Sequence, residues 1–373
     1  MLNQHTLHSV GVTVRDLEKT MAKIGQVFGI DDWEVAEVGR DRISDAVSRG
    51  RQIAGGAYRT ATGTTTLRSD LVGGREARNK FPYRTVTFEL VQPLKGESPF
   101  QEFLATRGQG VSHVVFNEGP EDSATVAAHL AAQGVPTLAA FTVDGERRVF
   151  HDTRASLGGF FVEVRPAGAR TKGEAVNVSG AYERPDGVEP FPVIGVSHFG
   201  VVIDDLMATL PEYHRLLGCA DFPIKNWTAC LGSLDAPYFR DEKVDHAYFT
   251  GMGTCGDFQF EIIQPTFGPS DYNVGFRDVK GGPGVHHMLL YVTASGTEWD
   301  KTVKDMADLG HHQHMGSDLR GGAAEFCYFD TAKDVGFVVE SVYGGKPDPV
   351  PAEQHLADPE IFEVDFNDLI NAD

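Results

Sequence analysis

Hydrophobic and polar residues alternate in several short segments of the chain, and helical patterns follow them. Alternation with a period of two is typical of β-strands, whereas apolar residues three and four positions apart are typical of amphipathic helices. The four alternating segments lie near residues 8–14, 111–117, 196–203 and 285–292. The helical stretches that follow them lie near 17–28, 121–133, 206–217 and 296–309. Short strands separated by turns come next, which predicts a β-α-β-β-β unit that occurs four times.

Sequence landmarks recur in the same order in the two halves of the chain, which indicates a duplication. The pairs of landmarks are Gly11–Leu17 with Gly200–Leu206, Phe88–Pro93 with Phe260–Pro265, Gly110–Phe116 with Gly284–Leu290, and Phe150–Thr153 with Tyr328–Thr331. The last landmark of each half leads to a Glu inside an apolar strand, Glu163 or Glu340. We therefore expect an α+β protein in which four units form two cupped mixed sheets.

The expected domains follow from this repeat. Residues 1–170 hold the first pair of units, with a degenerate metal site, and residues 193–345 hold the second pair, with the metal site. A linker covers 171–192, in a stretch rich in Pro, Gly and charge, and an acidic tail covers 346–373. Because the linker separates the halves, pairing of units within each half is favoured. The alternative pairs unit one with four and unit two with three.

Composition narrows the functional classes. Lys and Arg number 33 and Asp and Glu number 53, so the net charge is −20, which disfavours nucleic acids and anionic membranes as partners. No apolar run approaches the roughly 20 residues that span a bilayer, and the first residues lack the pattern of a secretion signal. Four scattered cysteines are typical of a reduced interior. We expect a cytoplasmic protein with a small-molecule substrate, and a homo-oligomer stays open.

Candidate chemistry comes from the inward positions of the second half. Counting by twos from the landmarks places His198, Glu261, His287 and Glu340 on one face of their strands. A Glu inside an apolar strand needs a cation or hydrogen-bond donors, because a bare buried carboxylate costs several kcal/mol. Two imidazoles and two carboxylates suit one divalent ion, such as Zn, Mn, Co, Ni or Fe(II), with two positions left for substrate oxygens.

The first half has an incomplete set at the same positions. Aligning Gly11 with Gly200 places Ser9, rather than His8, opposite the first histidine of the second half. The other three positions hold Glu89, His113 and Glu163. Since a hydroxyl is a poor ligand, we expect a weak or vestigial site here, although a bulge could rotate His8 inward.

These motifs resemble the vicinal oxygen chelate superfamily, which includes glyoxalase I, methylmalonyl-CoA epimerase, extradiol dioxygenases and hydroxyphenylpyruvate dioxygenase. The residues that carry the resemblance are VSHFGVVIDDL, FQFEIIQP, GVHHMLLYV and YFDTAKDVGFVVESV. Isomerases and lyases of this type use all four ligands and move a proton through an enolate-like intermediate. The oxygenases leave the second position uncoordinated. Because Glu261 fills it here, the resemblance favours an isomerase or lyase, with Glu261 or Glu340 also acting as base.

Other residues are weaker candidates. His246 and Tyr248 alternate on a strand expected to border the pocket, where either could position a substrate or move a proton, or simply pack on the sheet. His311, His312 and His314 are expected at the exposed end of a helix. Two further hypotheses remain beside the isomerase or lyase: an Fe(II)-dependent dioxygenase of the extradiol or a related type, and a non-catalytic protein that binds a ligand in the cup.

Overall fold

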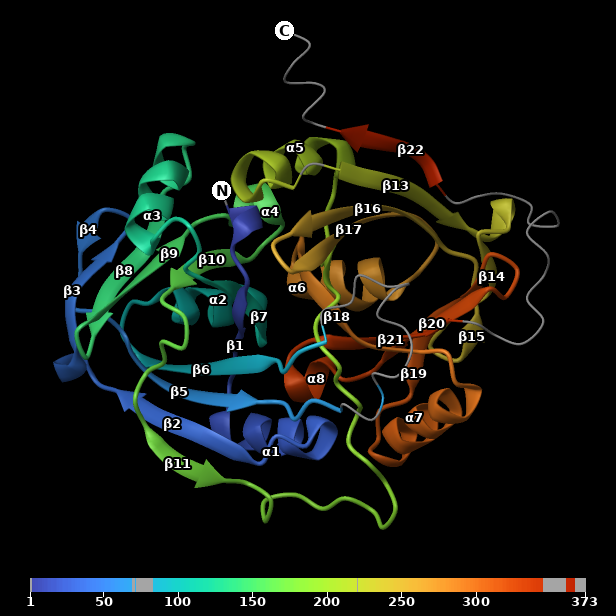
Figure 1. The fold of residues 1–373 in the computed structure, drawn as a ribbon, viewed down its shortest axis with the longest axis horizontal. Coiled ribbons are helices and arrows are strands. Elements are labelled where there is room, and N and C mark those ends of the chain that lie inside the picture. The colour runs from blue at the N-terminus through green and yellow to red at the C-terminus, as the bar shows by residue number, and fades with distance from the viewer. Residues whose placement is uncertain (1, 69–70, 72–82, 220, 345–359, 366–373) are drawn as a thin grey trace, which may run out of the picture.

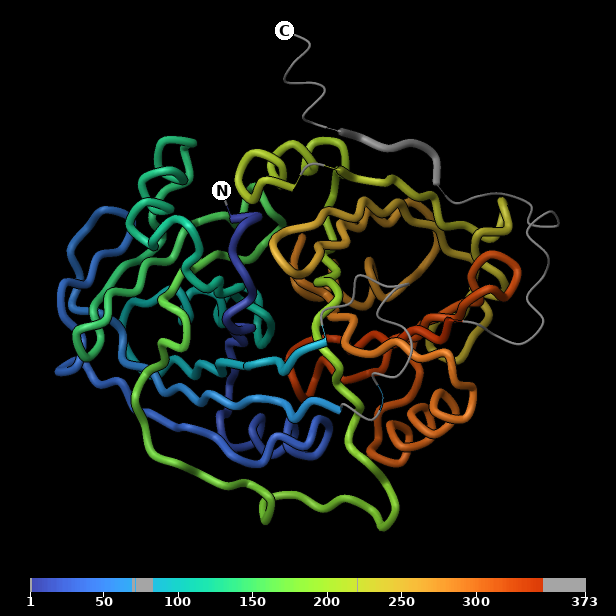
Figure 2. The backbone as a smooth tube through the Cα atoms, viewed as in Figure 1, coloured from blue at the N-terminus to red at the C-terminus, as the bar shows by residue number. Residues whose placement is uncertain are grey.

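A computed structural model describes residues 2–68, 71, 83–219, 221–344 and 360–365. Figure 1 shows two halves side by side, the first coloured blue to green and the second yellow to red. The tube in Figure 2 shows that each half curls around an interior of its own. The expected cupped sheets are thus present in both halves.

The described residues of the first half form one sheet and four α-helices. Its strands are β1 (Leu7–Thr13), β2 (Asp32–Val38), β3 (Ile43–Ser48), β4 (Arg51–Gln52), β5 (Ala57–Thr64), β6 (Thr87–Lys95), β7 (Gly110–Asn117), β8 (Thr137–Val143), β9 (Glu146–His151), β10 (Phe161–Arg165) and β11 (Glu174–Asn177). Its helices are α1 (Leu17–Phe28), α2 (Pro99–Arg107), α3 (Ser123–Ala132) and α4 (Arg154–Leu157), with 3-10 turns at Leu2–Gln4 and Arg40–Arg42.

The second half repeats this plan. Its strands are β12 (His198–Val202), β13 (Asp221–Thr228), β14 (Leu234–Phe239), β15 (Glu242–Lys243), β16 (Ala247–Cys255), β17 (Phe258–Phe267), β18 (Gly284–Thr293), β19 (Gln313–Leu319), β20 (Ala324–Phe329), β21 (Val338–Gly344) and β22 (Glu360–Asp365). Its helices are α5 (Leu206–Leu217), a π-helical turn at Asp271–Arg277, α6 (Asp278–Lys280), α7 (Gly296–Asp308) and α8 (Ala332–Val335), with a 3-10 turn at Ala229–Leu231.

Strand order shows that the units pair within each half. The first sheet runs β11-β2-β5-β6-β1-β7-β10-β9-β8-β3-β4, and the second runs β22-β13-β16-β17-β12-β18-β21-β20-β19-β14-β15. The two orders match strand for strand. The linker and the tail each contribute an edge strand: β11 pairs with β2, and β22 pairs with β13. Most of the predicted tail, 346–359 and 366–373, lies outside the described residues.

One part of each sheet departs from the simple repeat. Strands β3 and β4 leave the first unit and join the edge of the second, where β3 pairs with β8, and β14 pairs with β19 in the same way. This exchange extends the cup around its interior. Local sequence does not predict it, because the partner strand lies about a hundred residues away.

Repeated Asp-Leu pairs begin the first helix of each half. Asp16 and Asp205 are N-caps whose carboxylates accept hydrogen bonds from the backbone of Lys19 and Ala208. A side-chain acceptor at this position satisfies a free N–H of the first turn and contributes about 0.5–2 kcal/mol. The predicted helices 17–28 and 206–217 therefore have the bounds of α1 and α5.

Three apolar clusters make up the core. The largest joins the helices to the outer faces of both sheets and runs across the two halves, where Phe337 stacks on Phe28 and Phe88. The other two clusters fill the interiors of the cups. Phe100 and Phe103 of α2 enter the first cup, and Tyr272 and Phe276 of the π-helical turn enter the second.

Candidate metal centre

Four potential ligands meet inside the second cup, one from each of four neighbouring strands. His198 begins β12, Glu261 lies on β17, His287 on β18 and Glu340 on β21. These strands are adjacent in the order β21-β18-β12-β17. The ligand atoms of the four residues all lie within 4.8 Å of one another. The structure therefore brings together the four residues predicted from the repeat.

A glycine makes room for this group. Gly200 pairs with Glu261 on one side and with His287 on the other. A Cβ atom at Gly200 would lie 1.9 Å from Cε1 of the His287 ring, so a larger residue would displace the imidazole. Gly11 has the same relation to His113, at 2.0 Å. The repeated glycine of the first landmark is thus required by the histidine on the neighbouring strand.

Distances between the donor atoms test whether a metal ion fits. Nε2 of His198 lies 2.9 Å from Oε2 of Glu340 and 3.4 Å from Oε2 of Glu261. Nε2 of His287 lies 3.2 Å from the same Glu340 oxygen and 3.3 Å from the Glu261 oxygen. Ligands about 2.1 Å from one ion stand roughly 3.0 Å apart at right angles and roughly 3.4 Å apart in a tetrahedron. The observed distances fall in this range.

The two imidazoles also face each other, with 3.4 Å between their Nε2 atoms. At this distance one Nε2–H can donate to the other nitrogen, whereas two lone pairs or two N–H groups would repel each other. One divalent cation would accept both lone pairs and neutralise both carboxylates. A mixed set of two nitrogens and two oxygens suits Zn, Mn, Fe(II), Co or Ni.

The electrostatics of the group favour positive charge. Burial alone would lower the pKa of His198, but its hydrogen bonds with Glu261 and Glu340 outweigh burial and raise that pKa to about 10. Burial alone would raise the pKa of Glu261, but His198 and His287 lower it. The carboxylates thus stabilise either a proton on His198 or a cation that replaces the proton.

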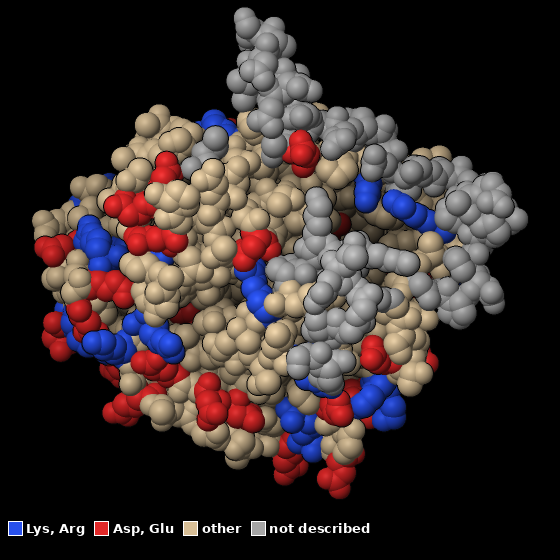
Figure 3. Space-filling model, viewed as in Figure 1, with Lys and Arg blue, Asp and Glu red and all other residues tan. Residues whose placement is uncertain are grey.

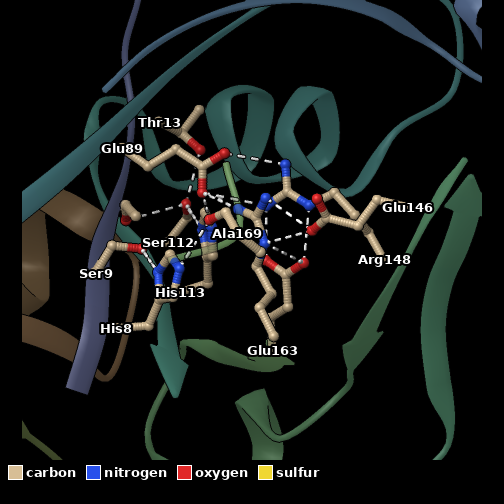
Figure 4. Close-up of polar contacts among 12 residues, drawn as sticks. His8, Ser9, Thr13, Glu89, Ser112, His113, Glu146, Arg148, Glu163 and Ala169 are labelled. Atoms are coloured by element: carbon tan, nitrogen blue, oxygen red, sulfur yellow. Dashed lines mark hydrogen bonds and ion pairs between the residues drawn. The ribbon is translucent and has the colours of Figure 1, made fainter. Parts of the chain in front are cut away.

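The first cup holds a comparable group, but an arginine occupies its centre (Figure 4). Glu89, His113 and Glu163 form the second cluster of ligand-type residues. Arg148 donates to Glu89 at 3.0 and 3.1 Å and to Glu163 at 2.6 and 2.8 Å. Arg165 adds a longer contact to Glu89, at 3.4 Å. The carboxylates of this cup are therefore neutralised by guanidinium groups of the chain itself.

Ser9 occupies the position of His198, as expected. Ser9 pairs with Val115 on the neighbouring strand, and His198 pairs with Leu289 at the same register. The register shifts at His8, so the bulge considered from the sequence is present. His8 donates to the carbonyl of Ala169 at 2.8 Å and accepts from the Ser9 hydroxyl at 2.9 Å. His8 does not join the cluster of ligand-type residues.

The two cups differ in charge at equivalent positions, where arginines of the first cup are replaced by apolar residues in the second. Phe150 pairs with Glu163 as Tyr328 pairs with Glu340, so the positions two residues before them, Arg148 and Phe326, are equivalent. By the same alignment, Val342 stands where the first half has Arg165. Among the described residues, no Lys or Arg forms an ion pair with Glu261 or Glu340. The half with the complete ligand set is the half that lacks an internal cation.

An aromatic wall lies beside the four ligands. The Tyr328 ring lies 4.6 Å from the His287 ring, centroid to centroid. The hydroxyls of Tyr272 and Tyr328 are 2.6 Å apart, and the Tyr248 ring lies 4.9 Å from that of Tyr272. The first half has Phe100 and Phe150 where the second has Tyr272 and Tyr328. At these two positions the wall of the second cup carries hydroxyl groups that the first cup lacks.

Tyr248 and His246 lie at different distances from the ligand group. Tyr248 belongs to the wall, and burial first, then Glu261, raises its pKa well above the usual value. His246 stacks on Tyr248 with 6.0 Å between ring centroids and donates to the carbonyl of Val244 at 3.2 Å. His246 thus contacts Val244 and the wall residue Tyr248 rather than the ligands, and its role in proton transfer stays a prediction.

Sequence reasoning missed residues next to the ligands. His286 precedes a predicted ligand in the pair of histidines of GVHHMLL, and it hydrogen-bonds to both His287 and Asp271. The expectation of an exposed helix end at 311–314 is wrong for His311, which is buried, and for His314, which lies on β19 and contacts Asp271 at 3.0 Å. The doubled histidine was the available signal, whereas Asp271 carried none.

No family model and no curated protein matches the sequence. A mutant of 4-hydroxymandelate synthase from Streptomyces coelicolor has a similar structure, with a TM-score of 0.51 and 14% identity over 94% of this chain and 96% of that chain. A halotolerant catechol dioxygenase gives a TM-score of 0.42 at 11% identity, covering 93% and 89%. A Mn(II)-bound glyoxalase from Novosphingobium aromaticivorans gives 0.43 at 14% identity, covering 94% and 84%.

The chain has the vicinal oxygen chelate fold. The first of these matches spans both halves, so the likeness covers the duplicated plan and not one cup alone. At 14% identity the likeness shows the fold alone, because one fold can carry many different chemistries.

The surface fits the composition. On the face shown in Figure 3, acidic and basic side chains are intermixed, and the basic side chains form no broad patch. None of the helices in the described ranges is both long enough and apolar enough to span a membrane.

Proposed function

We propose that the protein is a metal-dependent isomerase or lyase that acts on a small oxygenated organic molecule bound in the second cup. One observation supports this most directly: a buried and a half-buried carboxylate and two facing imidazoles have the spacing of metal ligands, in the cup where no arginine among the described residues neutralises them. His198, Glu261, His287 and Glu340 would hold the ion. A bound divalent metal would polarise a carbonyl of the substrate and stabilise negative charge that develops on its oxygen.

Glu261 is central to the choice of reaction. Its Oε2 stands 3.3 and 3.4 Å from the two histidine nitrogens, much as Glu340 stands at 3.2 and 2.9 Å. A fourth protein ligand leaves fewer positions for both substrate and O₂, which favours proton transfer over oxygenation. Glu261 is also the most exposed of the four side chains, at 14% against 7% for Glu340.

Glu261 is therefore our candidate for the general base. A proton next to a carbonyl would pass to its carboxylate, and the tyrosine hydroxyls of the wall would orient the substrate's oxygens. General acid-base catalysis by a positioned side chain typically contributes 10²–10⁴-fold. The observation that Tyr272 and Tyr328 replace two phenylalanines of the first cup supports a polar ligand here.

The experiment has two stages. Metal analysis of the purified protein should find about one divalent ion per chain, and Glu261→Gln should weaken its retention. Loss of the α-proton signal in D₂O is then followed by NMR under nitrogen for a panel of 2-oxo acids and α-hydroxy ketones. Exchange that needs the metal and falls at least about 100-fold in Glu261→Gln supports the proposal.

Two results would overturn it. Unchanged metal content and unchanged exchange in Glu261→Gln would exclude the assigned ligand and base. Turnover that requires O₂ would instead identify a dioxygenase. Glu298→Gln is the matched control, because Glu298 lies in the first turn of α7 on the outer side of the second sheet and contacts Thr293 and Tyr291 rather than the ligand group.

A further inference from the structure

A chain of hydrogen bonds leads from one metal ligand to the surface. Nδ1 of His287 lies 2.9 Å from Nδ1 of His286, whose Nε2 lies 2.9 Å from Oδ2 of Asp271. The other oxygen of Asp271 lies 3.0 Å from Nε2 of His314. His286 and Asp271 are buried, whereas the His314 side chain is 19% exposed. This series of hydrogen bonds therefore begins at the ligand group and ends at the protein surface.

A β-bulge makes the first contact possible. Gly200 pairs with His287, but the next residue, Val201, pairs with Val285, so His286 is an extra residue in β18. Neighbouring residues of a regular strand point to opposite faces, and the bulge lets both imidazoles enter the cup. Tyr272 and Tyr328 pack against the His286 ring at 5.3 and 5.4 Å, which holds it in place.

The hydrogen bonds are consistent with only one arrangement of protons if His287 offers its Nε2 lone pair. In neutral His287 the proton then sits on Nδ1 and is donated to Nδ1 of His286. His286 must in turn carry its own proton on Nε2, where Asp271 accepts it. Asp271 accepts a second hydrogen bond from His314, so every donor in the chain has an acceptor.

The first cup serves as an internal comparison. Ser112 occupies the equivalent bulge and lies 3.0 Å from Nδ1 of His113. Pro99 follows the N-cap Ser98 as Asp271 follows the N-cap Ser270. Leu138 precedes Ala139, the partner of Phe150, as His314 precedes Met315, the partner of Tyr328. All three ionisable members of the chain are thus absent from the cup that contains Arg148.

We propose that Asp271, His286 and His314 are positioning residues that hold His287 in the tautomer whose Nε2 lone pair faces the metal ion. This inference rests on the metal site of the proposed function. Outer partners of a metal-binding histidine fix its ring and tautomer, and their loss typically weakens metal affinity 10–100-fold. In such sites a carboxylate often accepts directly from the metal-binding histidine. Here the imidazole of His286 stands between Asp271 and His287.

The test measures binding of Co²⁺ alone to the metal-free protein, by competition with a chelator and by the visible spectrum of the bound ion. We expect His286→Ala to weaken Co²⁺ binding 10–100-fold and to alter the spectrum. His286→Ser should recover much of the affinity, because in the first cup a serine hydroxyl forms a hydrogen bond with the same nitrogen of the equivalent histidine, and a hydroxyl can accept from it. His312 is exposed and is not part of this series of hydrogen bonds. His312→Ala is therefore the control and should bind as the wild type does.

A second pair of variants examines Asp271, which joins His286 to His314. Asp271→Leu removes both acceptor atoms and should resemble His286→Ala, whereas Asp271→Asn keeps one acceptor and should lose less affinity. Circular dichroism confirms folding; if the other two variants unfold, Asp271→Asn decides the question, because it should still bind Co²⁺ more weakly than the wild type and His312→Ala. Equal affinity in all variants would overturn the positioning role while leaving the metal site intact. No binding by the wild type would instead overturn the metal site itself.

Discussion

Arg148 offers the sharpest test of the comparison between the two cups. Its side chain is 1% exposed and makes four hydrogen bonds of 2.6–3.1 Å with Glu89 and Glu163. Arg148→Met keeps the length of the side chain but removes the cation. Breaking a buried ion pair costs about 3–5 kcal/mol, because the remaining charge stays buried without a partner. We expect a loss of this size in the free energy of unfolding.

The assay is urea denaturation followed by circular dichroism, with EDTA present so that no metal ion replaces the lost cation. A loss of about 3–5 kcal/mol corresponds to roughly 4–6 °C in melting temperature for a chain of this size. The neighbouring Arg147 is exposed, and its guanidinium donates to the carbonyl of Asp45 at 2.8 Å. Arg147→Met is therefore the matched control, and it should change stability by about 0.5 kcal/mol or less.

A coupling measurement separates charge from packing. In a background that carries both Glu89→Gln and Glu163→Gln, Arg148→Met should cost at least about 2 kcal/mol less, because no carboxylate is left unpaired. The reasoning would be refuted by a loss within about 1 kcal/mol of the Arg147→Met control, or by an equal loss in both backgrounds. Either result would mean that Arg148 contributes packing alone and does not replace a metal ion.

Three further predictions concern the two groups of carboxylates. Replacing Ser9, Arg148 and Arg165 by His, Phe and Val gives the first cup the ligand set of the second and removes its two arginines. Metal analysis should then find about two ions per chain instead of one; one ion in a folded variant would contradict the equivalence of the two ligand sets. Glu340→Gln should lower Co²⁺ affinity at least about 10-fold by isothermal titration, since it removes one of two anionic ligands, and unchanged affinity would exclude it from the site. Burial alone would raise the pKa of Glu89, but Arg148 and Arg165 lower it well below 4.5. The stabilising contribution of this carboxylate is therefore complete above about pH 4.5 and is lost as the pH falls below that value. Glu89→Gln should flatten the decline in urea stability between pH 5 and pH 3, and an unchanged slope would argue against this pairing.

Much of the ligand set follows from the sequence alone. The repeat locates strand positions, and the period of two along a strand fixes which side chains share a face. Glu261 and Glu340 stand out because a carboxylate in an apolar strand needs a partner. The alignment of Ser9 with His198 was also correct, because the register of a strand is a local property once the landmark glycines are matched.

Tertiary structure decided what fills the space between those side chains. Nothing in the local pattern around Arg148 shows that its guanidinium enters the first cup, because β9 meets β6 only through the closed sheet. The contact of Asp271 with His286 and His314 joins a π-helical turn, a bulge and a distant strand. A sequence therefore specifies the face of each strand, which depends on local geometry, whereas the charge balance inside a cup depends on side chains from strands that meet only when the sheet closes.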